Sequence, residues 1–167
     1  MAVQTGRTTS PWVNLIIHDY AGVLREIPIN GISICGVAYE ESDMTAWQDA
    51  VAGALPNMPD APIEFTGPYD VQDARAVSAS GAVPLLSGSH IVLEPIMGVL
   101  TTLSVDIQFG IRHTWETGEI QFGITRAAGD GYLLVKYDVD FDNMTYAARL
   151  VLFPGSALPD FGDTAEA

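Results

Sequence analysis

Apolar and polar residues alternate along three long segments of this chain, and this alternation constrains the fold more than any other feature. The segments are Val99 to Phe109, Ile120 to Ile124 and Leu133 to Phe141. A period of two is typical of β-strands that bury one face and leave the other face polar. Shorter strands are expected over 13–18, 25–35 and 63–67. We therefore predict a mainly β protein with antiparallel sheets.

Glycine- and asparagine-containing turns separate these runs, since both residues accept positive φ. The turns fall at Asp19–Gly22, Thr114–Gly118, Ala128–Gly131 and Asp142–Asn143. Thr114–Gly118 is the expected tip of a long hairpin over 99–124. The last long strands are predicted to form a meander that ends near Phe153.

Two segments interrupt the strand pattern. Glu40–Pro62 is predicted to be a long loop with a short helix over 45–55, and loops of this length are often binding elements. Asp73–Ser80, in an Ala- and Ser-rich stretch, is predicted to be one helix that flanks a sheet. We expect a single domain over 1–155 and an extended acidic C-terminal tail over 156–167.

Composition narrows the class of function. The 167 residues carry 21 acidic and seven basic side chains, a net charge of -14, which repels phosphate and argues against binding of nucleic acid. Only 17% of the residues are charged, against about 25% in typical soluble domains, so we expect much of the surface to be covered in an assembly. Mean hydropathy is +0.21, yet no apolar stretch approaches the ~18 residues of a transmembrane helix. Met1–Ser10 lacks the apolar core of a secretory signal, so synthesis in the cytoplasm is expected.

Catalytic and cofactor motifs are absent from the sequence. It has no G-x-S-x-G, no H-E-x-x-H and no phosphate-binding glycine loop, and its one cysteine, Cys35, excludes an internal disulfide. His18, His90 and His113 are scattered over unrelated segments. We therefore expect a protein that is not an enzyme and has no metal or cofactor.

The segment Asp138–Asn143 has the D-x-D-x-D start of an EF-hand loop. Asn143 stands where that loop needs glycine, and Arg149 stands where it needs the bidentate glutamate, which weakens calcium binding. We interpret the segment as the acidic, solvated face of a strand. A calcium- or sugar-binding β-sandwich is the alternative, with Trp12, Trp47 and Trp115 available to stack on sugar rings.

Four ordered segments resemble the major tail tube proteins of long-tailed bacteriophages. They are HDYAGVLREIPINGISI, PIEFTGPYD, IQFGIRHTWETGEIQFGI and LLVKYDVDFDNMTYAARLVLFPG, within residues 13–155. The resemblance implies a β-sandwich with one flanking helix, of which six copies close a ring through an inner β-barrel. Rings would stack into a hollow tail tube of the virion, alongside a tape-measure and other tail proteins, and DNA would pass the acidic lumen without being bound. A tail terminator, a tail-completion protein and a capsid decoration protein are the related alternatives.

Candidate functional residues follow from this resemblance and lie at interfaces. The predicted inter-ring loop contains Met44, Trp47 and Met58, and the predicted hairpin tip contains Arg112 and Trp115. Asp106, Asp138, Asp140 and Asp142 are the candidates for a charged wall.

Overall fold

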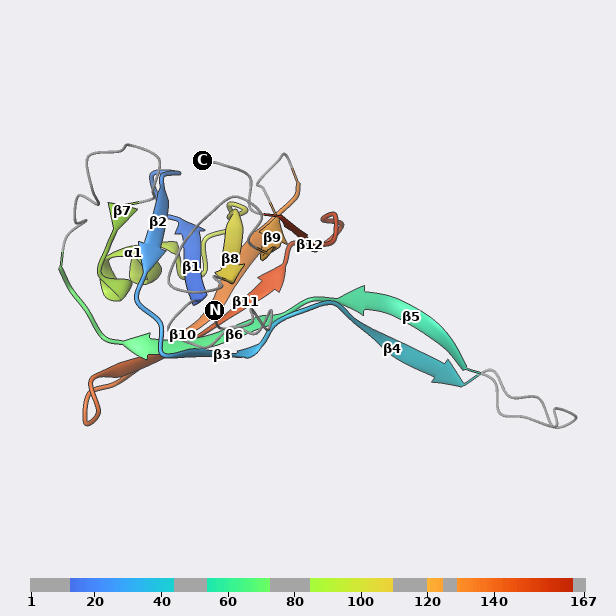
Figure 1. The fold of residues 1–167 in the computed structure, drawn as a ribbon, viewed down its shortest axis with the longest axis horizontal. Helices are drawn as coiled ribbons and strands as arrows, with labels where there is room; N and C mark the ends of the chain where they lie inside the picture. The colour runs from blue at the N-terminus through green and yellow to red at the C-terminus, as the bar shows by residue number, and fades with distance from the viewer. Residues whose placement is uncertain (1–12, 44–53, 73–84, 110–119, 125–128, 164–167) are drawn as a thin grey trace, which may run out of the picture.

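Two mainly antiparallel sheets pack face to face in this computed structural model, which describes residues 13–43, 54–72, 85–109, 120–124 and 129–163 (Figure 1). The six-stranded sheet has the order β12-β9-β8-β1-β2-β7, and the four-stranded sheet has the order β10-β11-β6-β3. The first sheet contains β1 (Val13–His18), β2 (Leu24–Ile27), β7 (Leu85–Leu86), β8 (Val105–Phe109), β9 (Ile120–Ile124) and β12 (Asp160–Asp163). The second contains β3 (Gly31–Ile34), β6 (Ile63–Pro68), β10 (Tyr132–Asp140) and β11 (Thr145–Leu152). The predicted antiparallel sandwich is confirmed.

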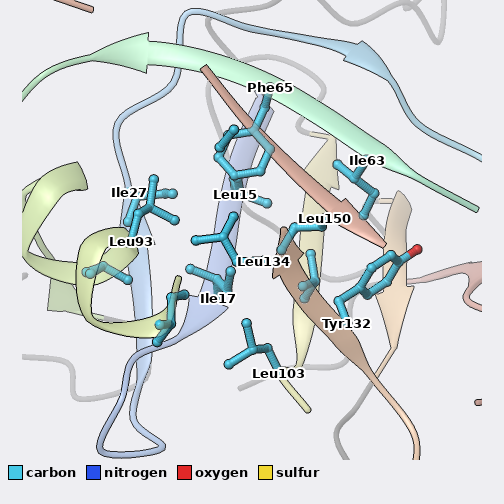
Figure 2. Close-up of a cluster of buried hydrophobic side chains, with 14 of the residues drawn as sticks. Leu15, Ile17, Ile27, Ile63, Phe65, Leu93, Leu103, Tyr132, Leu134 and Leu150 are labelled. Carbon is cyan, nitrogen blue, oxygen red and sulfur yellow. The ribbon is translucent and has the colours of Figure 1, made fainter. Parts of the chain in front are cut away.

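Alternating apolar residues from both sheets form one core (Figure 2). Leu15 and Ile17 of β1 meet Phe65 of β6 and Leu150 of β11, and all four are at most 1% exposed. The buried Tyr132 donates its hydroxyl hydrogen bond to the carbonyl of Ala61 at 2.9 Å. The apolar contacts of β1 with β6 and β11 join the two sheets, because burying such side chains is the main favourable term in folding.

The chain changes sheets at two places where we predicted continuity. The strand predicted over 25–35 is split into β2 and β3, because Pro28 and the residues after it carry the chain from one sheet to the other. The predicted meander is also wrong: β9 pairs with β8 and β12, whereas β10 pairs with β11.

The strand predicted from Val99 begins only at Val105, after a lone bridge between Leu103 and Tyr132.

A β-bulge between Leu134 and Lys136 changes which residues of β10 face the core. Before the bulge Leu134 is buried, and after it Tyr137 and Val139 pack against the core while Asp138 is exposed. The uninterrupted alternation predicted from Leu133 therefore holds only for the second half of the strand, because the extra residue reverses the side-chain direction.

The helix α1 (Ser89–Ile96) flanks the sandwich beside β2 and β10 and buries Val92, Leu93 and Ile96 in the core. One flanking helix was predicted, but over Asp73–Ser80, which lies outside the described residues. Sequence signals for α1 are weak: it begins after Gly88 without a side-chain cap and has Pro95 in its last turn.

Residues 40–62, predicted as a long loop, contain an antiparallel hairpin. Its strands are β4 (Ala38–Asp43) and β5 (Ala54–Asp60), and we call this pair the arm. The arm continues from β3 and β6 and projects away from the sandwich (Figure 1). Of the short helix predicted over 45–55, residues 45–53 lie outside the described part, and Ala54 and Leu55 belong to β5.

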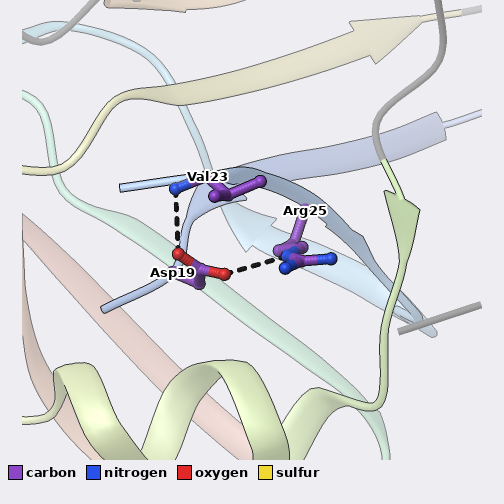
Figure 3. Close-up of polar contacts among 3 residues, drawn as sticks. All are labelled: Asp19, Val23 and Arg25. Atoms are coloured by element: carbon purple, nitrogen blue, oxygen red, sulfur yellow. Dashed lines mark hydrogen bonds and ion pairs between the residues drawn. The ribbon is translucent and has the colours of Figure 1, made fainter. Parts of the chain in front are cut away.

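The predicted turn Asp19–Gly22 lies between β1 and β2. Asp19 closes the β1–β2 turn: its carboxylate accepts hydrogen bonds from the Val23 N–H and the Arg25 Nε at 2.9 Å each, and Gly22 has φ 79° (Figure 3). Burial opposes ionisation of Asp19, but the Val23 and Arg25 bonds and the Arg25 charge together hold the pKa of its carboxyl below the ordinary value. In the tail beyond Gly155, residues 160–163 pair with β9 as the edge strand β12.

Candidate assembly surfaces

The outer face of the four-stranded sheet carries two of the predicted wall residues. Asp138 of β10 lies opposite Ala147 of β11, which lies opposite Thr66 of β6. Thr66 lies opposite Gly31 of β3, so these four residues form one row across the sheet. Asp140 lies at the end of β10, opposite Thr145. The predicted acidic strand face therefore points away from the core.

The basic residues of this face are already paired with carboxylates. Lys136 Nζ lies 3.2 Å from Asp138 Oδ2, and Arg149 Nη1 lies 3.5 Å from Glu64 Oε1. Both pairs are well exposed and contribute little to stability. With Asp140, the described part of the face holds three carboxylates against two cations.

Asp140 is used by the β10–β11 turn rather than by a cation site. Its Oδ1 accepts hydrogen bonds from the backbone N–H groups of Asp142 and Asn143, and its Oδ2 accepts one from the Asn143 amide at 2.7 Å. These bonds, with the Asn143 amide first, lower the pKa of Asp140. Within the described ranges, no three His, Cys, Asp or Glu side chains are grouped so that they could hold a metal.

Asp106, the fourth predicted wall residue, lies in the other sheet. It sits on β8 between Ile16 of β1 and Gly123 of β9. Glu26 of β2 lies in the same row, beyond Ile16, and burial raises the pKa of its carboxyl. The structure thus brings Asp138, Asp140 and the adjacent Asp142 together but places Asp106 apart from them.

A groove of about 410 Å³ crosses the outer face of the four-stranded sheet. Its lining residues come from β6, β10, β11 and the turn before β3: Asn30, Thr66, Asp138, Val139, Asp140, Thr145, Tyr146 and Ala147. The hollow forms where the row has small members, since Ala147 has only a methyl group and open space lies above Gly31. Sequence reasoning found the carboxylates but missed the groove, because only the strand register places Ala147 beside Thr66 and Asp138.

Strand edges are the second notable surface. β3 and β10 are the outer strands of the four-stranded sheet. The start of β10 is covered, because Leu103 bridges to Tyr132 and the Gly98 N–H bonds to the Leu134 carbonyl. β10 continues for six more residues as an edge strand, and an edge strand is a template for pairing with another chain.

Large apolar side chains are exposed over several elements. Leu100 is 79% exposed, Tyr20 72%, Phe141 68% and Phe161 60%.

For the other predicted interface residues, the structure describes no side chain. Met44, Trp47, Arg112 and Trp115 lie outside the described residues, as do Trp12 and His113. Met58 is in β5 of the arm, where only the backbone is described. Their roles stay predictions.

The fold is similar to that of chains from three cryo-EM structures. One is the sheath/tube terminator of PVC, an extracellular contractile injection system, in its extended state; the match has a TM-score of 0.53 and 10% sequence identity and covers 96% of this chain and 99% of that chain. The second is the PVC sheath–tube complex in the extended state; the match has a TM-score of 0.53 and 9% identity and covers 98% of this chain and 100% of that chain. The third is the tube-terminating cap of the anti-feeding prophage; the match has a TM-score of 0.54 and 9% identity and covers 98% of this chain and 95% of that chain.

At this identity the comparisons establish the fold alone. No protein-family model and no curated protein matches the sequence. In the described ranges, no helix is both long and apolar enough to cross a membrane. The sandwich with a flanking helix, which the sequence resemblance implied, is therefore a fold found in proteins of tail-like injection particles.

Proposed function

We propose that this protein is a structural subunit of a phage-tail-like particle and that a ring of its copies terminates the tail tube. The observation that carries the proposal is a fold shared over nearly the full length of both chains with tube-terminating proteins of injection systems. The exposed apolar residues and the low fraction of charged side chains agree with a subunit that is covered by neighbours. The proposed role is structural, without turnover of a substrate.

Ring closure follows from the open edges of the four-stranded sheet. β3 of one copy and the free part of β10 of the next would pair, so that every sheet continues into its neighbour. Head-to-tail contacts of this kind close into a ring when a whole number of copies completes one full turn. The outer face with Asp138 and Asp140 would then line the opening, where its excess of negative charge repels DNA phosphates and lets the duplex pass unbound.

Charge favours a single terminal ring over a stack of identical rings. The cations of the described residues are Arg25, Lys136 and Arg149, and each already contacts an acid of its own chain. With a net charge of -14, two identical rings repel each other when they stack, whereas a neighbour with a basic surface is attracted.

The repeating tube subunit is the second candidate. The arm favours it, because a two-stranded hairpin that projects from the sandwich can reach a neighbouring ring, as we predicted for the inter-ring loop with Met44, Trp47 and Met58. A tape-measure protein would then lie inside the tube.

Electron microscopy of the concentrated, purified protein, with its mass measured by light scattering, tests these candidates. The terminator predicts single rings of uniform bore that do not lengthen as the concentration or the salt is raised. Long tubes would favour the repeating subunit instead. A protein that stays monomeric under all these conditions would contradict both.

A further inference from the structure

The groove on the four-stranded sheet has the shape and charge of a peptide-binding site. It extends from Asp138 on β10, across Ala147 and Thr66, to Asn30 beside β3. Four adjacent strands span three spacings of ~4.8 Å, so the row is about 14 Å long. A short extended segment of another chain fits this length, and the volume of about 410 Å³ lies in the range of ligand sites.

Charge defines the kind of segment. Asp138 and Asp140 line one end of the groove, and the exposed Asp142 follows directly. Lys136 pairs with Asp138, but both side chains are more than half exposed. A cation from another chain can therefore replace Lys136 at little cost. At the opposite end Asn30 and Thr66 offer neutral hydrogen-bonding groups. The occupant that complements this arrangement has a lysine or arginine at one end and small polar residues along its length.

We propose that the groove binds an extended, lysine- or arginine-bearing segment of a different protein. A second copy of this chain is a separate outcome, which the mass of the assembled protein distinguishes from peptide binding. A metal ion is a poor occupant, because the described residues hold no group of three His, Cys, Asp or Glu side chains that could bind one. This face is also the one proposed to line the opening of the ring, but the groove needs only one folded chain, so its binding can be tested without ring formation.

Binding of a short synthetic peptide in which lysine alternates with serine tests this proposal, with fluorescence anisotropy as the readout. Ala147→Leu fills the middle of the groove without changing the charge, and Asp138→Asn removes one carboxylate. We expect each to weaken binding at least about tenfold. Asp160→Asn on β12 removes the same charge from the other sheet and is the matched control, with an expected change of less than about twofold. Thermal unfolding of each variant verifies that it is folded.

Equal weakening by Asp138→Asn and Asp160→Asn, with no effect of Ala147→Leu, would show attraction to the net charge only and overturn the proposal. Tight binding of a peptide in which glutamate replaces lysine would overturn it too. If the groove instead holds a second copy, Ala147→Leu will lower the mass of the assembled protein and leave peptide binding unchanged. Ring formation is scored separately, so a failure of this proposal is distinguishable from a failure of the tail assignment.

Discussion

The hydroxyl of Tyr146 should stabilise the place where the chain leaves one sheet for the other. Tyr146 on β11 is 2% exposed and donates a 2.8 Å hydrogen bond to the carbonyl of Pro28, which lies between β2 and β3. Its ring also contacts Phe65 and Tyr137 edge-on or tilted, with centroids 6.0 and 5.9 Å apart. Tyr146→Phe keeps these ring contacts and removes only the hydrogen bond.

The expected cost follows from what the substitution leaves behind. The Pro28 carbonyl loses its partner in a part-buried site, which costs about 1–2 kcal/mol of unfolding free energy. For a domain of 167 residues, this corresponds to a fall of roughly 2–8 °C in Tm. Circular dichroism during thermal and urea unfolding of dilute protein measures both quantities.

Tyr39→Phe is the matched control, because Tyr39 is 52% exposed on the arm. This variant should unfold at the same temperature as the native protein. An unchanged Tm for Tyr146→Phe, or an equal loss for Tyr39→Phe, would refute this account of the crossover between the sheets.

Further predictions concern packing and pH. Gly67→Ala should lower the unfolding free energy by about 1–3 kcal/mol, because its new methyl group would overlap the Pro28 carbonyl and the Tyr146 ring; urea unfolding measures the loss. Stability should fall as the pH rises from about 9 to about 12, because burial raises the pKa of Cys35 from 9.0 to about 11 and that of Tyr137 from 10.0 to about 12, and the unfolded chain loses these protons first. A flat urea midpoint from pH 8 to pH 12 would contradict that. Asp19→Asn should reduce the stability lost on acidification, since the pKa of Asp19 is lowered in the folded protein and its contribution disappears as pH falls through that pKa. An acid-unfolding curve identical to that of the native protein would exclude this role.

The alternation of residues predicts most of the strands but not how they are connected. It predicts strands at β1, β6, β9, β10 and β11, and β6 and β11 bury every second side chain over most of their length. It cannot reveal that Pro28 ends one sheet and leads to the other, since the same apolar pattern continues from Ile27 to Ile29. The bulge after Leu134 is also hidden, because Leu133, Leu134 and Val135 are all apolar and fit either face.

The helix and the arm were missed for energetic reasons. α1 is eight residues long, lacks a side-chain cap and contains Pro95, so its stability comes from burying Val92, Leu93 and Ile96 rather than from local preference. The arm contains Pro56 and Pro59 in β5, and proline usually argues against a strand. Proline is tolerated in a two-stranded hairpin because each strand has one unpaired edge.

The candidate site was predictable in its chemistry and not in its shape. Asp138, Asp140 and Asp142 stand out in the sequence as a charged strand end, and they do face outward. Asp106 looked equivalent, yet β8 belongs to the other sheet. Residues far apart in sequence, such as Asn30 and Ala147, become neighbours only through long-range strand pairing.

Disulfide cross-linking between β3 and β10 tests most directly whether copies join edge to edge. In a chain carrying Cys35→Ser, Ile34→Cys and Val135→Cys, both new cysteines are on edge strands at sites that are 44% exposed. Within one chain they are separated by β11 and β6, about 14 Å, which exceeds the ~7 Å limit between Cα atoms for a disulfide. A second pair, Ile34→Cys with Asp138→Cys, samples a shifted register.

Mild oxidation should produce a ladder of covalent oligomers that ends at one ring size, whereas each single-cysteine control should stop at dimers. If both double variants remain monomeric in concentrated protein, β3 and β10 do not meet between copies, and the ring account is contradicted.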